Sequence, residues 1–451
     1  MSQNDFTIAN QGFPAFRADL NSALQALASS NSGATAPSTT FANQLWYDTA
    51  NNILYIRNED NDAWIKLFTL DQTNDNVESL HADTIAEATS GNGVAVDGVT
   101  LKDGELGTTA SPVAIHSTSL NGGQFGGRRN IIINGAMQVA QRGTSFSGFT
   151  TSEYHLDNFR NGMGDTTARF TVTQASSGLN GFPHCLKYDC TTAEASLSNG
   201  NARMFLHTRF EGQDLQQLKK GTSDAEKVTV SFYVKSNKTG TYILELEDKD
   251  NTRQISKAYT ISSANTWEQK IITFDGDTTG AFDNDNNNSC HLTWHLIAGT
   301  NYQSGTLNTS WASQTHANRA VGNVNIGDST DNTWEITGVS MEVGDFPNGT
   351  PFEHRSVGEE LALCQRYFQI CNFNVQDYPP SAGYTDCHVS FLNQMRATPS
   401  ATITEATKFN ISGATGVHEL SVNSCRVENQ TSGNQVRTRQ SGGSLALSAD
   451  L

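Results

Sequence analysis

The sequence has few charged and few hydrophobic residues, and its basic residues are outnumbered by its acidic ones. Of its 451 residues, 17% are charged and 36% are hydrophobic, against about 25% and 45–50% in an average globular protein. This composition suits β-sheet and loop surfaces. The 29 Lys and Arg against 46 Asp and Glu leave a net charge of −17. Binding to nucleic acid depends on basic side chains that displace counterions from phosphates, so we expect no nucleic-acid partner.

Long apolar runs are also missing. Residues 131–133, three isoleucines, are among the longest, whereas a membrane helix needs about 20 consecutive apolar residues. No basic residue precedes Arg17 and no apolar core follows it, which is unlike a secretory signal. We therefore expect no membrane insertion, and a protein that stays in the cytosol or leaves it by cell lysis.

Cysteine pairs and catalytic motifs are the third absence. The cysteines number seven, are scattered and form no C-x-x-C pair, so neither a disulfide framework nor a zinc ribbon is indicated. The phosphate-binding loop, H-E-x-x-H, G-x-S-x-G and a G-x-G-x-x-G between a strand and a helix are all missing. The sequence thus predicts no enzyme and no cofactor.

The length is about three ordinary domains, and the residue pattern divides the chain into four parts. They are a helix plus a three-stranded meander in 1–70, a Gly/Ser/Thr-rich linker or shaft in 71–127, a β-sandwich of the jelly-roll type in 128–357, and a β-rich domain in 358–451. The predicted fold class is mainly β.

The N-terminal part carries one clear helical pattern. Its apolar residues follow heptad spacing, at Phe13, Phe16, Leu20, Ala23 and Leu27. Two heptads are too short to be stable alone in water, so the helix either packs on its own domain or meets other copies of itself. The strands of the meander are expected at 44–49, 53–57 and 63–67, with Trp46 and Trp64 in a small core.

Residues 93–104 form an ordered unit within the linker. The alternation of Val94, Val96, Val99 and Leu101 predicts two very short strands around a turn. Such strands cannot bury enough surface singly. The segment is therefore either a flexible linker or a stalk in which several chains share one core.

The sandwich is predicted from strands whose side chains alternate between a core face and a polar face. The clearest spans 228–235, and others follow at 242–247, 291–297 and 334–343, with a hairpin expected at 237–240 and a helix at 358–368. Six polar-face residues share one face if their strands are neighbours: Tyr233, Lys235, Glu245, Glu247, His291 and His295. Aromatic and charged groups on a concave sheet are suited to binding sugars, so these six are the candidate glycan-binding residues. The alternative is an ordinary solvated face.

Three weaker signals concern catalysis and metals. Glu245 and Glu247 lie about 7 Å apart on one strand face, the separation used by inverting glycosidases, but any Glu-x-Glu strand produces it. His291 and His295 span about 13 Å on a strand, too far to share one metal ion. Asp283 and Asp285 begin a run that resembles a calcium loop without its glycine and its closing glutamate, so a plain turn is favoured and no metal is expected.

Several segments resemble tail-fibre and related structural proteins of marine tailed phages. The opening at 6–24, which begins Phe-Thr-Ile-Ala-Asn-Gln-Gly-Phe-Pro, is similar to their virion-attachment end, together with Leu-Trp-Tyr-Asp-Thr at 45–49 and Ala-Trp-Ile-Lys-Leu at 63–67. The 93–104 unit resembles a shaft segment. The segments similar to a carbohydrate-binding-like jelly roll of that group lie at 129–143, 211–215, 231–236, 337–344 and 364–369.

This resemblance implies an elongated homotrimer located in the virion tail and assembled in the host cytoplasm. Its N-terminus would dock on a tail adaptor or nozzle protein, and its distal part would bind host cell-surface polysaccharide. The resemblance transfers no catalytic residue. Two alternatives stay open: a tailspike-like depolymerase of surface polysaccharide using Glu245 and Glu247, and a capsid or tail decoration protein with no receptor role.

Overall fold

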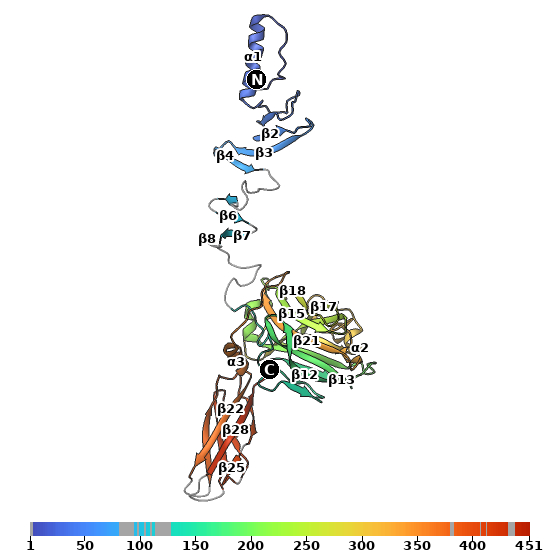
Figure 1. The fold of residues 1–451 in the computed structure, drawn as a ribbon, viewed down its shortest axis with the longest axis vertical. Helices are drawn as coiled ribbons and strands as arrows, with labels where there is room; N and C mark the ends of the chain where they lie inside the picture. Colours follow the sequence, from blue (N-terminus) through green and yellow to red (C-terminus); the bar gives the residue numbers. More distant parts are fainter. Residues whose placement is uncertain are drawn as a thin grey trace. The chain divides into compact units, whose positions relative to one another are not determined.

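The computed structural model describes residues 3–80, 128–378, 383–405, 407–411, 413–431 and 438–451, with the backbone of four short strands between 94 and 112. The chain divides into two units, Met1–His116 and Ser117–Leu451. Strands dominate both (Figure 1), so the predicted fold class is confirmed. In the part of the chain described, no helix has the length and hydropathy needed to cross a membrane.

The N-terminal unit combines one helix with a small antiparallel sheet. Helix α1 (Phe13–Ala28) has a proline in its first turn, where the missing N–H costs nothing. The sheet has strands β1 (Leu45–Asp48), β2 (Ile53–Arg57), β3 (Trp64–Asp71) and β4 (Asn76–Leu80) in that order. Trp46 is buried and packs on Tyr55 and Trp64 at ring distances of 5.0 and 5.3 Å. The predicted core is confirmed, and the meander extends one strand further than expected.

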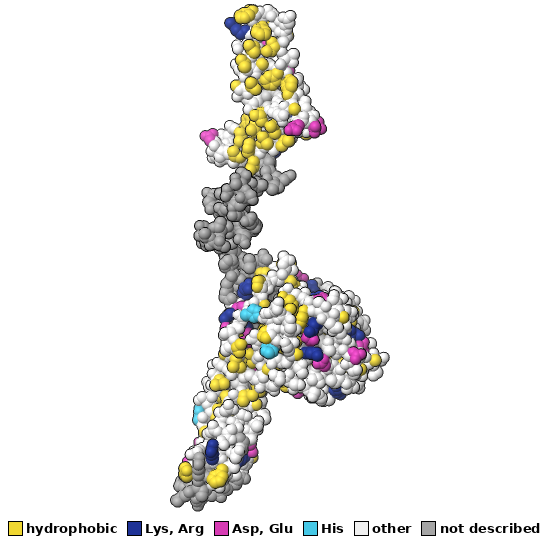
Figure 2. Space-filling view, in the orientation of Figure 1, with side chains coloured by type: hydrophobic (Ala, Val, Ile, Leu, Met, Phe, Trp, Pro, Cys, Tyr) yellow, Lys and Arg dark blue, Asp and Glu magenta, His cyan; other side chains and the backbone are white. Residues whose placement is uncertain are grey.

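Most of the apolar seam of α1 is not covered by its own unit. Ala23 is buried, but Phe13, Phe16 and Leu27 are 74%, 40% and 69% exposed. Figure 2 shows hydrophobic side chains gathered on the surface of this unit. Contacts within this unit therefore do not explain why apolar residues follow heptad spacing along α1.

Four short strands follow in the linker: β5 (Val94–Val96), β6 (Val99–Lys102), β7 (Glu105–Thr108) and β8 (Ser111–Pro112). β5 and β6 pair in antiparallel register, with Val94 opposite Leu101, which confirms the predicted pair of strands. The remainder of the predicted linker, and with it a core shared by several chains, lies outside the described residues.

The second unit begins with a sandwich of two antiparallel sheets. The seven-stranded sheet has the order β10 (Glu153–Tyr154), β11 (Arg160–Gly164), β14 (Arg203–Glu211), β19 (Asn288–Ala298), β16 (Gly240–Asp248), β17 (Arg253–Ile261) and β20 (Ala312–Ser313). The six-stranded sheet has the order β18 (Glu268–Phe274), β15 (Val228–Ser236), β21 (Thr333–Val343), β13 (Phe182–Thr192), β12 (Arg169–Leu179) and β9 (Ser145–Ser147). The 3₁₀ helices η1 (Gly212–Leu218) and η3 (Ile326–Asp328) lie in connections between strands.

The core of the sandwich is built by the predicted inward residues. Phe232 of β15 is fully buried, and its ring lies 5.2 Å from Tyr259 and 5.6 Å from Trp294 of the opposite sheet. Leu244 and Leu292 are buried on the same inner side. Strand alternation alone therefore located this core.

The hairpin predicted at 237–240 is wrong. β15 pairs with β18 and β21, whereas β16 pairs with β17 and β19. The turn residues carry the chain from one sheet to the other, with Gly240 at a positive φ of 133°. A turn signal shows that the chain changes direction, but it does not show which strand the next one will pair with.

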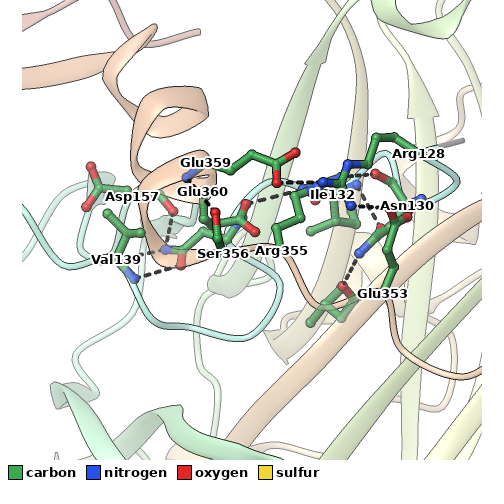
Figure 3. A network of polar contacts seen from close by, with 12 residues as sticks. Arg128, Asn130, Ile132, Val139, Asp157, Glu353, Arg355, Ser356, Glu359 and Glu360 are labelled. Atoms are coloured by element: carbon green, nitrogen blue, oxygen red, sulfur yellow. Dashed lines mark hydrogen bonds and ion pairs between the residues drawn. The ribbon is translucent and has the colours of Figure 1, made fainter. Parts of the chain in front are cut away.

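The segment at 129–143 serves the fold. The Asn130 side-chain oxygen accepts hydrogen bonds from the Ile132 and Met341 backbone N–H groups, each at 3.0 Å. The Glu353 carboxylate accepts from the backbone N–H of Asn130 at 2.9 Å and pairs with Arg128 at 3.0 Å. Figure 3 shows this network. It ties the start of the sandwich to the chain that leads into the next helix.

That helix, α3 (Val357–Gln365), is capped by Ser356, which accepts from the Glu359 N–H at 3.3 Å. Two small sheets with a separate apolar core follow. One contains β22 (Phe368–Asp377), β28 (Thr438–Ser448), β24 (Ser400–Thr404) and β25 (Thr407–Phe409); the other contains β23 (Tyr384–Ser390), β27 (Ser424–Gln430) and β26 (Gly416–His418). The predicted helix and β-rich C-terminal part are both present.

A buried carboxylate joins the sandwich to α3. Glu211, at the end of β14, has no exposed surface and accepts two hydrogen bonds from Arg366, at 2.6 and 2.7 Å. The Tyr367 hydroxyl donates a third at 2.6 Å. The 211–215 and 364–369 segments therefore meet in one structural contact.

Phe232→Ala tests the sandwich core. We expect the free energy of unfolding to fall by about 3–5 kcal/mol, because the substitution leaves a cavity between the two sheets. Chemical denaturation of the purified protein measures this loss, and Phe232→Leu, which keeps most of the apolar volume, should cost less than half as much. A loss below about 1 kcal/mol for the alanine variant would contradict this packing.

A second test concerns pH. His155 is 1% exposed between the rings of Phe146 and Phe149, at 4.8 and 4.6 Å, and neither ring nitrogen has a hydrogen-bond partner among the described residues. Burial lowers the pKa of His155 from 6.5 to about 4. Below pH 6.5 the unfolded chain binds a proton that the folded chain does not, so stability falls as the pH falls.

The expected loss from this residue between pH 8 and pH 5 is about 2 kcal/mol. His155→Phe keeps an aromatic ring at this position and should remove that part of the pH dependence. Denaturation curves at the two pH values measure it. An unchanged pH dependence in the variant would show that His155 accepts a proton in the folded state.

Candidate functional site

The six candidate glycan-binding residues do not share one face. Tyr233 and Lys235 lie on β15 of the six-stranded sheet, whereas the other four lie on β16 and β19 of the seven-stranded sheet. The prediction of a single face is therefore wrong, for the same reason as the predicted hairpin. β15 and β16 follow one another along the chain, but they belong to opposite sheets.

Tyr233 and Lys235 are engaged with neighbours near the six-stranded sheet. The Tyr233 ring lies 5.4 Å from Phe182. The Lys235 ammonium pairs with Glu335 at 2.8 Å and lies 4.8 Å from the centre of the Trp267 ring. These contacts are those of a stabilised surface rather than of side chains held ready for a ligand.

The four other candidates form two pairs on neighbouring strands. His295 Nε2 lies 3.0 Å from the Glu245 carboxylate, and His291 Nδ1 lies 3.4 Å from that of Glu247. All four are buried, with exposures between 0% and 6%. The alternative of an ordinary solvated face is therefore wrong at these positions.

Arg319 pairs with both of the buried carboxylates. It follows the short helix η2 (His316–Asn318) in the connection after β19, and it donates to both carboxylates, at 2.8 Å to Glu245 and 2.9 Å to Glu247. Burial alone would raise the pKa of Glu245, but Arg319 and His295 outweigh it and hold the pKa below its ordinary value. The pKa of Glu247 is lowered in the same way, against burial, by His291 and Arg319.

These lowered pKa values bear on the glycosidase alternative. A general acid at neutral pH needs a carboxyl group with a raised pKa. Glu245 and Glu247 are instead both ionised and bound to one arginine. The pair is therefore suited to fixing the surface above it and not to donating a proton.

A cavity of about 390 Å³ lies over this polar layer, and we call it the outer-face pocket. It is lined by Phe205, His207, His291 and His295, whose side chains we call its floor, and also by Arg160, Arg209 and Lys249. The floor follows from the strand register, in which Phe205 stands opposite His295 and Arg209 opposite His291. Every second residue of β14 therefore points into the pocket.

Phe205 is the half-buried aromatic ring of the floor. An added Cβ at Gly162, its partner on β11, would lie 2.1 Å from the ring. The ring therefore lies directly against the β11 backbone, which only glycine permits. Phe205 also contacts His207 and His295 edge-on, at 5.1 and 6.0 Å.

The rim comes from the connection between β19 and β21. Tyr302, in the short helix α2 (Thr300–Gln303), lies 5.7 Å from the ring of His316. The Tyr302 hydroxyl accepts a hydrogen bond from Arg203 at 3.3 Å, and Arg203 also pairs with Asp165 at 3.3 Å. Two aromatic rings and several N–H donors thus surround one cavity.

The pocket is positively charged although the chain is acidic. Arg160, Arg203, Arg209, Lys249 and Arg319 line it, and its one lining carboxylate is Glu247, with Glu245 in the layer beneath. Burial lowers the pKa of His207 and of His291, so both stay neutral at pH 7. The surplus of cations favours a ligand rich in oxygen atoms.

Sequence reasoning missed most of this pocket, including β14. A signal was present, since outward Arg203, Phe205, His207 and Arg209 alternate with apolar residues and a threonine. Arg160 and Tyr302 carry no comparable pattern. They reach the pocket only through the pairing of β11 with β14 and through the connection after β19.

Asp283 and Asp285 lie in the loop before β19. Asp285 accepts a hydrogen bond from the Asn287 N–H at 2.9 Å, and the Asp283 N–H donates to Asp250 at 3.0 Å. The Asp285 contact is that of the predicted turn, whereas the Asp283 contact joins the loop to the chain just after β16. The described residues contain no group of three or more His, Cys, Asp or Glu placed to hold a metal ion.

No protein-family model matches the chain, and no curated protein matches its sequence. Among solved structures, it is similar to the enzymatically active domain of tailspike protein 4 of bacteriophage CBA120, with 11% identity and a TM-score of 0.26 over 48% of this chain and 21% of that chain. It is also similar to the family 11 carbohydrate-binding module of Lic26A-Cel5E of Clostridium thermocellum, with 12% identity and a TM-score of 0.22 over 47% of this chain and 98% of that one. Discoidin II of Dictyostelium discoideum matches with 10% identity and a TM-score of 0.16 over 64% and 94%. All three TM-scores lie below 0.5, so the function has to be argued from the pocket itself.

Proposed function

We propose that the protein is a tail-fibre-type structural protein of a phage virion that binds a host-surface glycan in the outer-face pocket. The observation that carries the glycan part is the pocket itself, which is lined by half-buried Phe205 and Tyr302 and by the N–H donors of Arg160 and Arg203. Sugars bind by stacking their apolar ring faces on aromatic side chains and by directional hydrogen bonds to their hydroxyls. The pocket offers both kinds of group.

The virion part of the proposal is supported by the N-terminal unit. Its segments resemble the attachment end of phage tail fibres, and the seam of α1 leaves Phe13, Phe16 and Leu27 exposed at heptad spacing. Such a seam is typical of contacts between helices of separate chains. In this proposal three copies of the chain cover it, and the trimer docks on a tail adaptor or nozzle protein of the virion.

The assembly is tested by replacing Phe13 and Leu27 together with Asp. Both are largely exposed within one chain, so the unit should still fold, but the charges should prevent the seams from meeting. Light scattering should give three times the 48.8 kDa mass of one chain for the unaltered protein and a smaller mass for the variant. The matched control is Gln25→Asp, an exposed position on the same helix outside the seam.

A mass of one chain for the unaltered protein at micromolar concentration would contradict the trimer. An undiminished mass in the Phe13 and Leu27 variant would show that the seam is not what holds the copies together.

Glycan binding is tested by Tyr302→Ala and Phe205→Ala. Each removes a stacking surface, and we expect the affinity for the host polysaccharide to fall about tenfold or more. Binding of the purified protein to host cells and to a glycan array measures this. The matched control is Tyr233→Ala on the six-stranded sheet, which should bind as the unaltered protein does.

Loss of binding in the Tyr233 variant alone would place the glycan on the opposite sheet and overturn the proposal. The same preparations also test the depolymerase alternative, by assay of new reducing ends. We expect none, and reducing ends that disappear with Glu245→Gln would establish hydrolysis instead.

A further inference from the structure

One corner of the outer-face pocket holds two arginines, Arg160 and Arg209, that pair with no Asp or Glu side chain among the described residues. Arg160 makes no hydrogen bond or ion pair among the residues that the structure describes; its side-chain neighbour is the Tyr154 ring, 6.0 Å away. Arg209 donates through Nη1 to an oxygen of Leu451, the last residue of the sequence, while its Nε has no partner among the described residues. The two arginines lie on adjacent strands, β11 and β14.

His207 lies between them. It stands directly opposite Arg160 in the strand register and two residues before Arg209 on the same face of β14. Only 2% of the residue is exposed, yet neither ring nitrogen has a hydrogen-bond partner in the part of the chain that the structure describes. Leaving a buried polar group unpaired is costly. A neutral imidazole aimed into the pocket offers one N–H, which a bound ligand would satisfy.

The Asp and Glu side chains near this corner are already paired with other cations. Asp450 is held by Arg142 at 2.6 Å, and Glu247 is shared by Arg319, Lys249 and His291. Burial and the like charge of Arg209 both lower the pKa of Arg160. An anion placed between the two arginines would relieve their repulsion and supply the missing acceptor.

We infer that the outer-face pocket selects acidic saccharides, and that Arg160, Arg209 and His207 bind the carboxylate or sulfate group of the sugar. The inference rests on the proposed glycan binding and narrows its substrate class. Phe205 lies next to His207 on the same strand face, 5.1 Å away ring to ring, so one sugar residue can contact the ring and the anion site together. Neutral sugars would leave Arg160 without an anionic partner.

The test uses the full-length protein and a panel of oligosaccharides in matched pairs. Each uronate oligosaccharide is paired with its carboxyl-reduced form, and each sulfated oligosaccharide with its desulfated form. We expect the affinity for each acidic oligosaccharide to exceed that for its neutral partner by about tenfold or more, because the neutral partner cannot form the charge-assisted hydrogen bonds. The two kinds of pair distinguish a carboxylate from a sulfate ligand.

Arg160→Gln should abolish this preference while leaving the melting temperature nearly unchanged. The matched control is Arg169→Gln on the six-stranded sheet, which removes the same charge outside the pocket. The preference should persist in the control. An effect of both variants alike would reflect overall charge and would overturn the anion site.

The remaining outcomes separate this inference from the proposed function. Binding of neutral sugars that depends on Tyr302 but not on Arg160 would overturn the inference and leave glycan binding intact. Binding of no member of either kind would overturn both.

Discussion

The structure of the candidate site depends on the contact of Arg319 with Glu245 and Glu247. One guanidinium pairs with two carboxylates that are almost completely buried on the outer face of the seven-stranded sheet, and Lys249 supplies a second cation to Glu247. Buried charges are tolerated only when they are paired, and loss of one partner leaves the other uncompensated at a cost of several kcal/mol. The contact also fastens the connection after β19, which carries Tyr302 and His316, to the strands beneath. Floor and rim of the outer-face pocket are therefore fixed together.

A second set of buried polar contacts holds the larger unit together. Asn130 and Glu353 join the start of the sandwich to the chain before α3, and Glu211 joins the end of β14 to Arg366. Their role is to satisfy backbone groups and to fix a junction. The chemistry of the pocket comes from other residues.

Much of the fold could be predicted from the sequence because strand alternation is a local property. The inner residues Val230, Phe232 and Leu292, the closing strand β21 and the capped helix α3 all followed from short patterns. The candidate site was only half predictable. The prediction placed four residues correctly on one sheet face: Glu245, Glu247, His291 and His295. Tyr233 and Lys235 belong to the other sheet. A local sequence pattern does not determine which strands pair with one another. Arg319 and Arg160 were missed for the same reason.

The central claim is that a glycan binds over β14 and β19, and a crystal structure of the protein with a bound acidic oligosaccharide tests it most directly. The account predicts a sugar ring against Phe205 or Tyr302, with its carboxylate or sulfate between Arg160 and Arg209. Electron density for the sugar on the six-stranded sheet beside Tyr233, or on the C-terminal strands after α3, would contradict it.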